Sequence, residues 1–338
     1  MGNRILVVGT HDTKDDELNY LARVIRGQCG DVLTMDVSVL GDPKQPTDWT
    51  KHDAAQAARS SIAAAVASGD ENFAMQLMAR GSAALAQRLY AEGRFDGVIV
   101  LGGSMGTDLA LDLCASLPLG VPKYVVSTVS FSPMIPPERF APDMQMILWV
   151  GGLYGLNSVC KAALSQAAGA VLGAARAVEM PARDRPLIGM TSFGKTVLRY
   201  MVALKPALEA RGYEAAVFHA TGMGGRAFEA LAAEGAFAAV MDSAPQEVTN
   251  HLFGSAISAG PDRMTAAVLR GMPQMVAPGC YDLIDAVGWH TPSRGFQDAP
   301  SHAHNRLLSS YVTDAGQRRQ VARVIAERLA QVTVFLQI

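Results

Sequence analysis

The stretch GVIVLGGSMGTDLALDL, residues 97–113, joins an apolar run to a glycine-rich turn and then to a helical pattern. It predicts a strand that ends near Gly102, a tight turn and a helix. Glycines let the backbone approach an anion closely, and the free N–H groups at the start of a helix add donors and the positive end of its dipole. Ser104 and Thr107 add hydroxyl groups. The turn is therefore a candidate anion site, although the same pattern alone also fits a simple strand-to-helix connection.

The same alternation of short β-rich runs and longer helical patterns extends along the whole chain. Strands are expected at residues 4–9, 32–38, 97–103, 123–128 and 144–150, and again at 186–191, 215–222, 238–243 and 274–279. Nearly continuous apolar strands with helices between them indicate parallel sheets covered on both faces. The second half also echoes the first, because VVGTHDTKDDELNYLARVI and LIGMTSFGKTVLRYMVALK both show a strand, a polar turn with a lysine and a helix.

A charged, proline-bearing segment, residues 176–186, separates the two halves. We therefore expect an α/β protein with two Rossmann-like open parallel-sheet domains facing a cleft. The domains are predicted at residues 1–180, a nucleotide-binding domain, and 184–338, a C-terminal α/β domain. The proline-rich stretch PMIPPERFAP, residues 133–142, predicts a stiff loop that either borders the cleft or is a surface connector.

Composition excludes several classes of protein. The chain has 338 residues, 49% of them apolar and 18% charged, and a formal net charge of −2, so no basic face for nucleic acid is expected. The four cysteines form no C-x-x-C pair, which fits a reducing compartment. An early charged N-terminus and the lack of an apolar run of about 20 residues predict neither a signal peptide nor a membrane span. We expect a cytoplasmic protein without a membrane partner, and a homodimer because symmetric dimers are the commonest oligomers.

Polar segments follow four expected strands of the first half. They are Gly9–Lys14, Asp36–Ser38, Gly102–Thr107 and Ser127–Thr128. In an open α/β sheet the carboxyl ends of the strands form the ligand crevice, so these segments are predicted to converge on one site.

The segment GTHDTKDD, residues 9–16, offers the only lysine of these strand ends. Lys14 is predicted to meet phosphate oxygens, and Thr10 and Thr13 to donate hydrogen bonds. Asp12 has a local alternative, which is to cap the helix that follows.

Further motifs run in order along nearly the whole chain. They are GTHDTK (9–14), DVS (36–38), ARG (79–81), GGSMGT (102–107), LPLGVPKYVVSTVS (117–130), GLN (155–157), FHATGMGGRAFE (218–229), SAGPDR (258–263), APG (277–279) and HN (304–305). With these motifs the chain resembles the UPF0261 family, the Tm-1-like ATP-binding proteins. The resemblance implies a two-domain α/β protein that binds ATP in its N-terminal half, and we expect Mg²⁺ with the nucleotide.

The resemblance and the strand ends together assign a set of residues to the nucleotide. These are Gly9, Thr10, Lys14, Asp36, Ser38, Arg80, Gly102, Gly103, Ser104, Gly106, Thr107, Ser127 and Thr128. Arg80 enters through the resemblance alone, which implies a guanidinium for phosphate or base; its sequence pattern alone fits an exposed helix arginine.

Two departures from the family pattern keep other functions open. Residues 131–150 lack the glycine-rich sequence that relatives have there, and the chain ends at VTVFLQI, where relatives normally continue. One alternative is a metabolic enzyme that acts on a small carboxylate or sugar acid without a nucleotide. Another is a non-catalytic regulatory binding protein, which the lack of a recognisable catalytic triad favours.

The stretch GMTSFGKT, residues 189–196, matches the P-loop pattern G-x-x-x-x-G-K-T. Asp242, at the end of a later apolar strand, mimics the aspartate that binds Mg²⁺ in P-loop proteins. We nevertheless do not expect a P-loop here, because the phosphate-binding turns that relatives share lie in the first half and, as a rule, relatives lack this lysine. Lys195 is instead expected to meet an anionic substrate.

Ionisable residues also gather at the expected strand ends of the second half. They are His219, Asp242, Glu247, Asp262, Arg263, Asp282, His302 and His304. If chemistry occurs here, we predict His219 and Glu247 as acid and base, with Arg263 and Lys195 neutralising an anionic substrate. The pair His302 and His304 lacks an evident third ligand, so zinc is not predicted.

Overall fold

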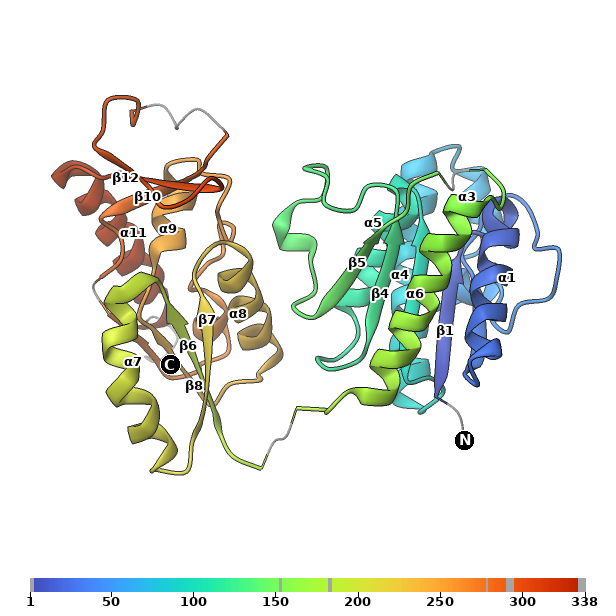
Figure 1. The fold of residues 1–338 in the computed structure, drawn as a ribbon, viewed down its shortest axis with the longest axis horizontal. Helices are drawn as coiled ribbons and strands as arrows, with labels where there is room; N and C mark the ends of the chain where they lie inside the picture. Colours follow the sequence, from blue (N-terminus) through green and yellow to red (C-terminus); the bar gives the residue numbers. More distant parts are fainter. Residues whose placement is uncertain (1–2, 152–153, 182–183, 278, 290–294, 334–338) are drawn as a thin grey trace. The chain divides into compact units, whose positions relative to one another are not determined.

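The computed structural model describes residues 3–151, 154–181, 184–277, 279–289 and 295–333. The chain divides into two compact units, Met1–Pro181 and Ala182–Ile338 (Figure 1). Each unit is built on a parallel sheet flanked by helices, so the predicted α/β class with two Rossmann-like sheets is confirmed. The predicted cleft between the domains remains a prediction.

The N-terminal unit contains a five-stranded parallel sheet in the order β2-β1-β3-β4-β5. Its strands are β1 (Arg4–Gly9), β2 (Asp31–Asp36), β3 (Gly97–Gly102), β4 (Lys123–Ser127) and β5 (Met144–Leu148). Its helices are α1 (His11–Gly27), α2 (Lys51–Ala57), α3 (Ile62–Ala67), α4 (Glu71–Ala91), α5 (Ser104–Ala115), the 3₁₀ helix η1 (Pro137–Arg139) and α6 (Ser158–Ala177).

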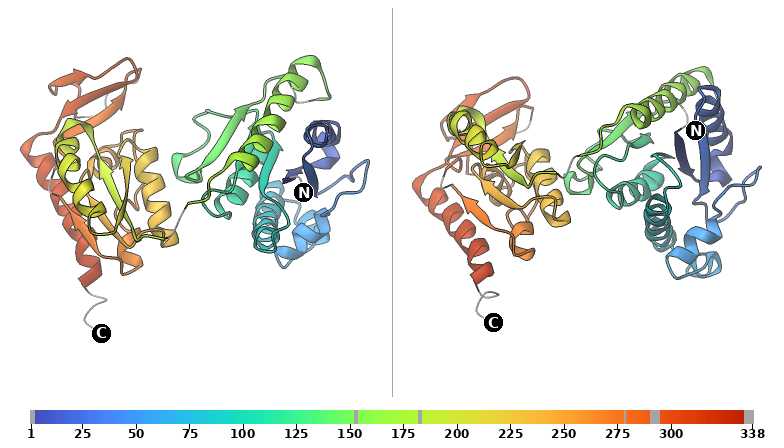
Figure 2. Two further views of the ribbon diagram at one scale, coloured as in Figure 1. Left: turned by 60° about the horizontal axis from the view of Figure 1, so that its bottom comes forward. Right: turned by 90° about the horizontal axis from the view of Figure 1, so that it is seen from below.

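Two apolar layers explain why the strand sequences are almost continuously hydrophobic. Leu6 and Val8 of β1 pack into the core formed with α4 and α5, whereas Ile5 and Val7 pack into the core formed with α1 and α6. Figures 1 and 2 show α1 and α6 lying along one face of the sheet. Successive side chains of a strand point to opposite faces, and here both faces are covered.

The strand order places a reversal beside β1. The chain passes from β1 to β2 on one side and later returns to β3 on the other side. In sheets of this order the loops after the two inner strands separate at their carboxyl ends and leave a crevice. The segments after β1 and β3, Thr10–Lys14 and Gly103–Gly106, flank that point.

The C-terminal unit contains a four-stranded parallel sheet in the order β7-β6-β8-β9, which repeats the order of the first four strands of the other unit. Its strands are β6 (Leu187–Ser192), β7 (Glu214–His219), β8 (Ala239–Asp242) and β9 (Gln274–Val276). Its helices are α7 (Gly194–Glu209), α8 (Met223–Glu234), α9 (Gln246–Leu252), α10 (Ala266–Leu269) and α11 (Ala315–Thr333). The echo seen in the sequence is thus a repeated strand order. Pro278, in the strand expected at 274–279, lies outside the described residues.

A second, antiparallel sheet in this unit was not expected from the sequence (Figure 2). Its strands β10 (Leu283–Val287), β11 (Ser301–Ala303) and β12 (Leu308–Val312) pair in the order β10-β12-β11. Asn305 forms the turn between β11 and β12, because its side-chain oxygen accepts hydrogen bonds from the amides of Leu307 and Leu308 at 2.8 and 3.0 Å.

The proline-rich loop is anchored within the N-terminal unit. Arg139 donates to the carboxylates of Asp108 and Asp112 on α5, each at 2.8 Å. This pairing fixes the loop against a helix whose first turn carries the glycine-rich segment. Among the described helices, none combines the length and apolar character needed to cross a bilayer.

Candidate functional site

A pocket of about 820 Å³ opens in the N-terminal unit at the carboxyl edge of its parallel sheet. Its walls come from the segments that follow β1, β2, β3 and β4 and from α3 and the start of α4. The residues predicted from the sequence that line it are Thr10, Thr13, Lys14, Gly102, Gly103, Ser104, Gly106 and Thr128. The structure thus brings the polar segments after β1, β3 and β4 together in one cavity.

The glycine-rich turn presents bare helix amides to this pocket. Helix α5 begins at Ser104, and Gly103 before it offers no capping side chain. The amides of Ser104, Met105 and Gly106 have no hydrogen-bond acceptor in the described part of the chain, whereas the Thr107 amide donates to Gly103. Such amides, together with the helix dipole, favour an anion.

Gly102 is required by the tightness of this turn. A Cβ atom at Gly102 would lie 2.5 Å from the Cα of Gly106, too close for any side chain. At Gly103 the nearest atom to such a Cβ is 3.8 Å away, so a methyl group fits there. The backbone of α5 therefore approaches β3 as closely as only glycine at position 102 permits.

Thr107 and Ser127 lie beneath the turn and do not line the pocket. Both are buried, with their hydroxyl oxygens 2.6 Å apart, and the Thr107 hydroxyl also donates to the Gly103 carbonyl at 2.7 Å. The Ser127 hydroxyl accepts a hydrogen bond from the Val129 amide at 3.0 Å. These contacts hold the loops after β3 and β4 in place, so both residues support the site from below.

The first turn of α1 also lines this pocket. Thr10 occupies the N-cap without a side-chain capping bond, and the Thr10 and Thr13 hydroxyls lie 3.0 Å apart. Lys14 departs from helical geometry, with φ −131° and ψ 25°. Its ammonium group makes no ion pair with the described residues, although it lines the pocket. Lys14 is therefore free to meet an anion.

Asp36 and Ser38, both predicted as ligand contacts, are used by the protein itself. The buried Asp36 carboxylate accepts hydrogen bonds from the amides of His11 and Ser38, at 3.2 and 2.9 Å. The Ser38 hydroxyl in turn accepts from the Asp12 amide at 3.0 Å. This clamp satisfies two first-turn amides of α1, so the pair positions that turn and does not line the pocket.

Gly9 and Arg80 are likewise absent from the pocket wall. Gly9 is buried at the end of β1, where a Cβ atom would lie 2.8 Å from a methyl group of Leu18. Arg80 is exposed on α4. Gly9 thus serves helix packing, and the guanidinium contact that the resemblance implied for Arg80 remains a prediction.

One half of the pocket is apolar, and sequence reasoning missed it. Val39 and Leu40 after β2, Val66 of α3 and Ala74 and Met75 of α4 all line the cavity. Leu40 and Val66 are 79% and 50% exposed. The sequence did carry a signal for this apolar surface. Two apolar residues, Val39 and Leu40, follow the DVS motif after the strand has ended, where a loop is usually polar.

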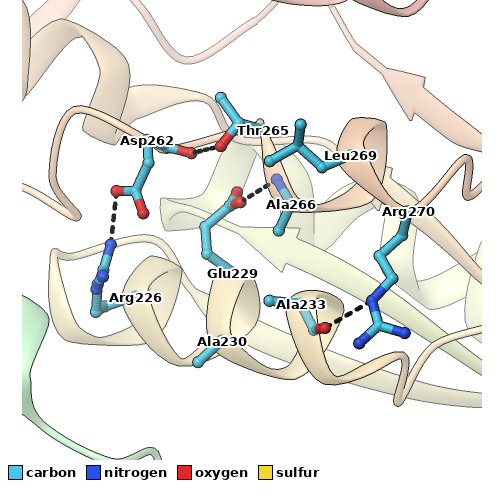
Figure 3. Close-up of a pocket in the computed structure, with 9 residues that line it drawn as sticks. All are labelled: Arg226, Glu229, Ala230, Ala233, Asp262, Thr265, Ala266, Leu269 and Arg270. Carbon is cyan, nitrogen blue, oxygen red and sulfur yellow. Dashed lines mark hydrogen bonds and ion pairs between the residues drawn. The ribbon is translucent and has the colours of Figure 1, made fainter. Parts of the chain in front are cut away.

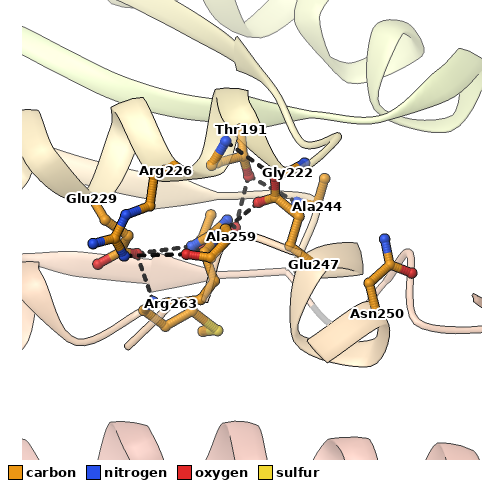
Figure 4. A network of polar contacts seen from close by, with 12 residues as sticks. Thr191, Gly222, Arg226, Glu229, Ala244, Glu247, Asn250, Ala259 and Arg263 are labelled. Carbon is orange, nitrogen blue, oxygen red and sulfur yellow. Dashed lines mark hydrogen bonds and ion pairs between the residues drawn. The ribbon is translucent and has the colours of Figure 1, made fainter. Parts of the chain in front are cut away.

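In the C-terminal unit, the predicted Arg263 and Glu247 belong to a buried ion-pair network (Figure 4). Arg263 is fully buried and forms a bidentate pair with Asp242, with N–O distances of 2.6 and 3.0 Å. It also donates to Glu247 at 2.9 Å and to Glu229 at 3.1 Å. One guanidinium thus holds three carboxylates together in the interior.

Glu247 has both carboxylate oxygens engaged. One accepts from the Gly222 and Gly225 amides, at 2.5 and 3.0 Å, and the other accepts from Arg263. Burial raises the pKa of the Glu247 carboxyl, and the neighbouring Arg263 charge opposes that rise. The catalytic roles expected for Glu247 and Arg263 remain predictions, while the contacts observed are those of a structural network.

His219 and Lys195 are exposed at neighbouring strand ends of the same unit. His219 ends β7 opposite Ser192 of β6, and its ring stacks on Phe193 with centroids 6.2 Å apart. Lys195 lies in the first turn of α7. The structure brings these two near one edge of the sheet, and neither lines either of the two pockets.

The GMTSFGKT segment does not form a phosphate-wrapping loop. Strand β6 extends to Ser192 and α7 begins at Gly194, which leaves only Phe193 between them. The residues that would form the loop of a P-loop protein are therefore part of the strand. Gly189 is small because a Cβ atom there would lie 2.8 Å from the ring of Phe237.

The other ionisable residues of this unit do not converge. Asp282, His302 and His304 are exposed, and Asp262 pairs with Arg226 at 2.6 Å. Among the described residues, no three His, Cys, Asp or Glu side chains are arranged to hold a metal ion.

A second, smaller pocket lies between α8 and α10, with a volume of about 340 Å³ (Figure 3). The Arg226–Asp262 pair closes one end, and Arg270, which donates to the Ala233 carbonyl at 2.7 Å, lies at the other. None of the predicted catalytic side chains lines this pocket.

The solved structures that match the chain resemble it only weakly. A glycosyltransferase of Streptomyces sp. SF2575, SsfS6, complexed with thymidine diphosphate, is 15% identical, with 81% of each chain covered and a TM-score of 0.21. UDP-GlcNAc 2-epimerase from Neisseria meningitidis is 9% identical, with 81% of this chain and 82% of that chain covered and a TM-score of 0.28. Similarity at this level supports no inference about a ligand.

Sequence comparison is far more specific. Residues 3–180 match the "Uncharacterised protein family (UPF0261) N-terminal domain" and residues 185–338 match the C-terminal domain of that family. A UPF0261 protein of Brucella suis is 55% identical over 96% of this chain and 78% of its own length. The ToMV resistance protein Tm-1 (GCR237) of Solanum lycopersicum is 28% identical over 96% of this chain, which spans 46% of that protein. The chain belongs to the UPF0261 family and has the tomato Tm-1 proteins among its relatives.

Proposed function

We propose that the N-terminal unit binds a nucleoside phosphate, specifically ATP with Mg²⁺, in the pocket at the carboxyl edge of its sheet. The observation that carries the proposal is the set of bare amides of Ser104, Met105 and Gly106, which line or adjoin the same pocket as the unpaired Lys14. A phosphate group accepts hydrogen bonds from amides of this kind and pairs with a lysine as a point charge.

The apolar half of the pocket supports a ligand that is not merely an inorganic anion. Val39, Leu40 and Met75 offer apolar contact, whereas the polar donors come from the segments after β1, β3 and β4. Small-molecule sites of this size are mostly apolar with a few convergent polar groups that fix orientation. A nucleoside divides in the same way, with a base to bury and a charged phosphate end. The resemblance to the Tm-1-like ATP-binding proteins selects ATP among the nucleotides.

The proposal concerns binding and assigns no reaction. Glu247 and Arg263 have their polar atoms occupied within the C-terminal unit, and the chemical roles of His219 and Lys195 remain predictions. The cytoplasmic location and the homodimer expected from the sequence also remain predictions.

Isothermal titration calorimetry with ATP and Mg²⁺ tests this function. Lys14→Ala should weaken binding by about tenfold or more, since a hydrogen bond to a charged group contributes about 1.5–3 kcal/mol. Lys44→Ala is the matched control, because Lys44 is 65% exposed, pairs with Asp16 and does not line the pocket.

Two results would overturn the proposal. One is the absence of any binding heat with wild-type protein, and the other is equal affinity of Lys14→Ala and wild type. A larger thermal stabilisation by small carboxylates or sugar acids than by any nucleotide would support the metabolic enzyme instead.

A further inference from the structure

The charges that line the pocket do not suit a bare polyphosphate. Lys14 is the only cationic side chain among the described residues of its wall, while Asp12, Asp70 and Glu71 contribute carboxylates. At pH 7 the wall therefore carries more negative than positive charge. A triphosphate without a counterion would meet repulsion there, since like charges a few ångströms apart in a partly buried site interact strongly.

The three carboxylates are not equivalent. One oxygen of Asp70 caps α4 by accepting from the amides of Asn72 and Phe73, at 2.9 and 3.1 Å. Glu71 is exposed in the first turn of that helix. Asp12 lies between Thr10 and Thr13 in the first turn of α1, and all three residues line the pocket together with Lys14.

Asp12 carries a buried oxygen that no described group satisfies. Its Oδ1 atom has no hydrogen-bond partner, and its Oδ2 atom accepts only a long 3.4 Å bond from the Gly41 amide. The capping role considered for Asp12 is wrong, because Thr10 holds the N-cap of α1 and no side chain caps that helix. A buried, unpaired carboxylate oxygen costs free energy unless a cation or a donor meets it.

The loop after β2 fixes this carboxylate in place. A Cβ atom at Gly41 would lie 2.7 Å from the Cβ of Asp12, so the loop backbone passes directly over the side chain. Lys51 holds that loop by donating to the Gly41 carbonyl at 2.7 Å and pairing with Asp42 at 2.8 Å. Asp12 is therefore held in one orientation and not free to turn into solvent.

We propose that Asp12 is the protein ligand of the Mg²⁺ ion that accompanies the nucleotide, an inference that rests on the proposed function. Mg²⁺ characteristically takes one or two carboxylates, keeps several waters and takes its remaining oxygens from the substrate phosphates. The described residues offer no cluster of three acidic, His or Cys side chains for a metal, which fits an ion that binds together with phosphate and not before it. The cation would coordinate the unpaired Oδ1 atom and offset the excess negative charge of the pocket wall.

The first test measures ATP affinity by calorimetry with Mg²⁺ and with EDTA, for wild type and for Asp12→Asn. Mg²⁺ should tighten ATP binding to wild type by about tenfold or more, and Asp12→Asn should lose that gain. In EDTA the variant should bind ATP at least as tightly as wild type, because a negative charge beside the phosphates is gone. Asp16→Asn, which removes an exposed carboxylate of α1 that does not line the pocket, is the matched control and should keep the gain.

The outcomes separate the inference from the function on which it rests. If wild type binds ATP equally well with Mg²⁺ and with EDTA, or if Asp12→Asn keeps the gain, the assignment of Asp12 is overturned while nucleotide binding stands. If wild type binds ATP under neither condition, the proposed function itself is overturned.

A second test needs no substitution and so does not depend on the folding of a variant. Mn²⁺ added to wild-type protein with ATP should broaden the amide resonances of residues 10–14 and of Gly41 most strongly. Strongest broadening around residues 69–71 would place the ion on the other carboxylates and overturn the proposal.

Discussion

Replacing Ser104 with proline removes one of the amides that we assign to phosphate, with little effect on the fold. Ser104 is the first residue of α5, where the N–H group has no acceptor within the helix, so proline removes no structural hydrogen bond. The preceding Gly103 has φ −76° and ψ −156°, an extended conformation that the residue before a proline can adopt. The substitution therefore deletes a ligand contact while α5 stays intact.

The size of the effect follows from the kind of hydrogen bond that is lost. A hydrogen bond to a charged group contributes about 1.5–3 kcal/mol, which corresponds to about a 10- to 150-fold weaker affinity for ATP. Because proline also removes the Ser104 hydroxyl, the comparison is with Ser104→Ala, which lacks only that group. Calorimetric dissociation constants of both variants isolate the amide, and thermal melts should show unchanged stability. Equal affinities of Ser104→Pro and Ser104→Ala, with both proteins folded, would refute the assignment of this amide to phosphate.

Three further experiments test the packing and the buried charges. Gly102→Ala should lower the free energy of unfolding by about 1–3 kcal/mol in urea titrations and weaken ATP binding, because its Cβ atom would meet backbone at 2.5 Å. Gly103→Ala should leave the free energy of unfolding unchanged, and equal losses of stability in the two variants would contradict the packing argument. Arg263→Met should lower the free energy of unfolding by about 3–5 kcal/mol, because it leaves buried carboxylates unpaired. Arg226→Met, at a partly exposed ion pair, should lower it by less than about 1 kcal/mol. Similar losses of stability in the two variants would show that the buried network is not the cause. Burial raises the pKa of the Glu247 carboxyl above its ordinary 4.5, so the folded state binds this proton more tightly than the unfolded chain does. The stability that the bound proton contributes is complete below about pH 4.5 and is lost as the pH rises through the folded pKa. Urea unfolding at a series of pH values should therefore show wild type losing stability relative to Glu247→Gln as the pH rises, and a pH-independent difference would be the contrary result.

The parallel sheets could be predicted because each strand is an apolar run that must be covered on both faces. Leu6 and Val8 point to one helical layer and Ile5 and Val7 to the other, so the sequence of β1 is hydrophobic throughout. The antiparallel sheet escaped prediction for the opposite reason. Strand β11 is Ser301–Ala303, three exposed residues without an apolar alternation, and only its pairing with β12 makes it a strand.

The candidate site was predictable where polar groups follow strands, and less so where the protein itself uses those groups. Lys14 and Gly102 line the pocket as the strand ends suggested. Asp36 also follows a strand, but its carboxylate is taken by the amides of His11 and Ser38. A sequence shows that a carboxylate is present and not whether an amide already occupies it.

The same limit applies to the buried network of the C-terminal unit. Asp242 and Arg263 lie 21 positions apart in sequence and form a bidentate pair at zero exposure. Their pairing depends on how β8 and the segment before α10 meet in space, which no local pattern reveals. From the sequence alone, a charged residue at a strand end therefore fits a catalytic group and a buried ion pair equally well.

Amide resonances report most directly on the claim that the bare start of α5 holds phosphate. In a ¹⁵N–¹H spectrum of the wild-type chain titrated with ATP and Mg²⁺, the amides of Ser104, Met105 and Gly106 should show the largest shifts, together with residues near Lys14. If ATP binds and these three amides keep their positions while resonances elsewhere move, phosphate is not held at this helix start and the account of the site is wrong.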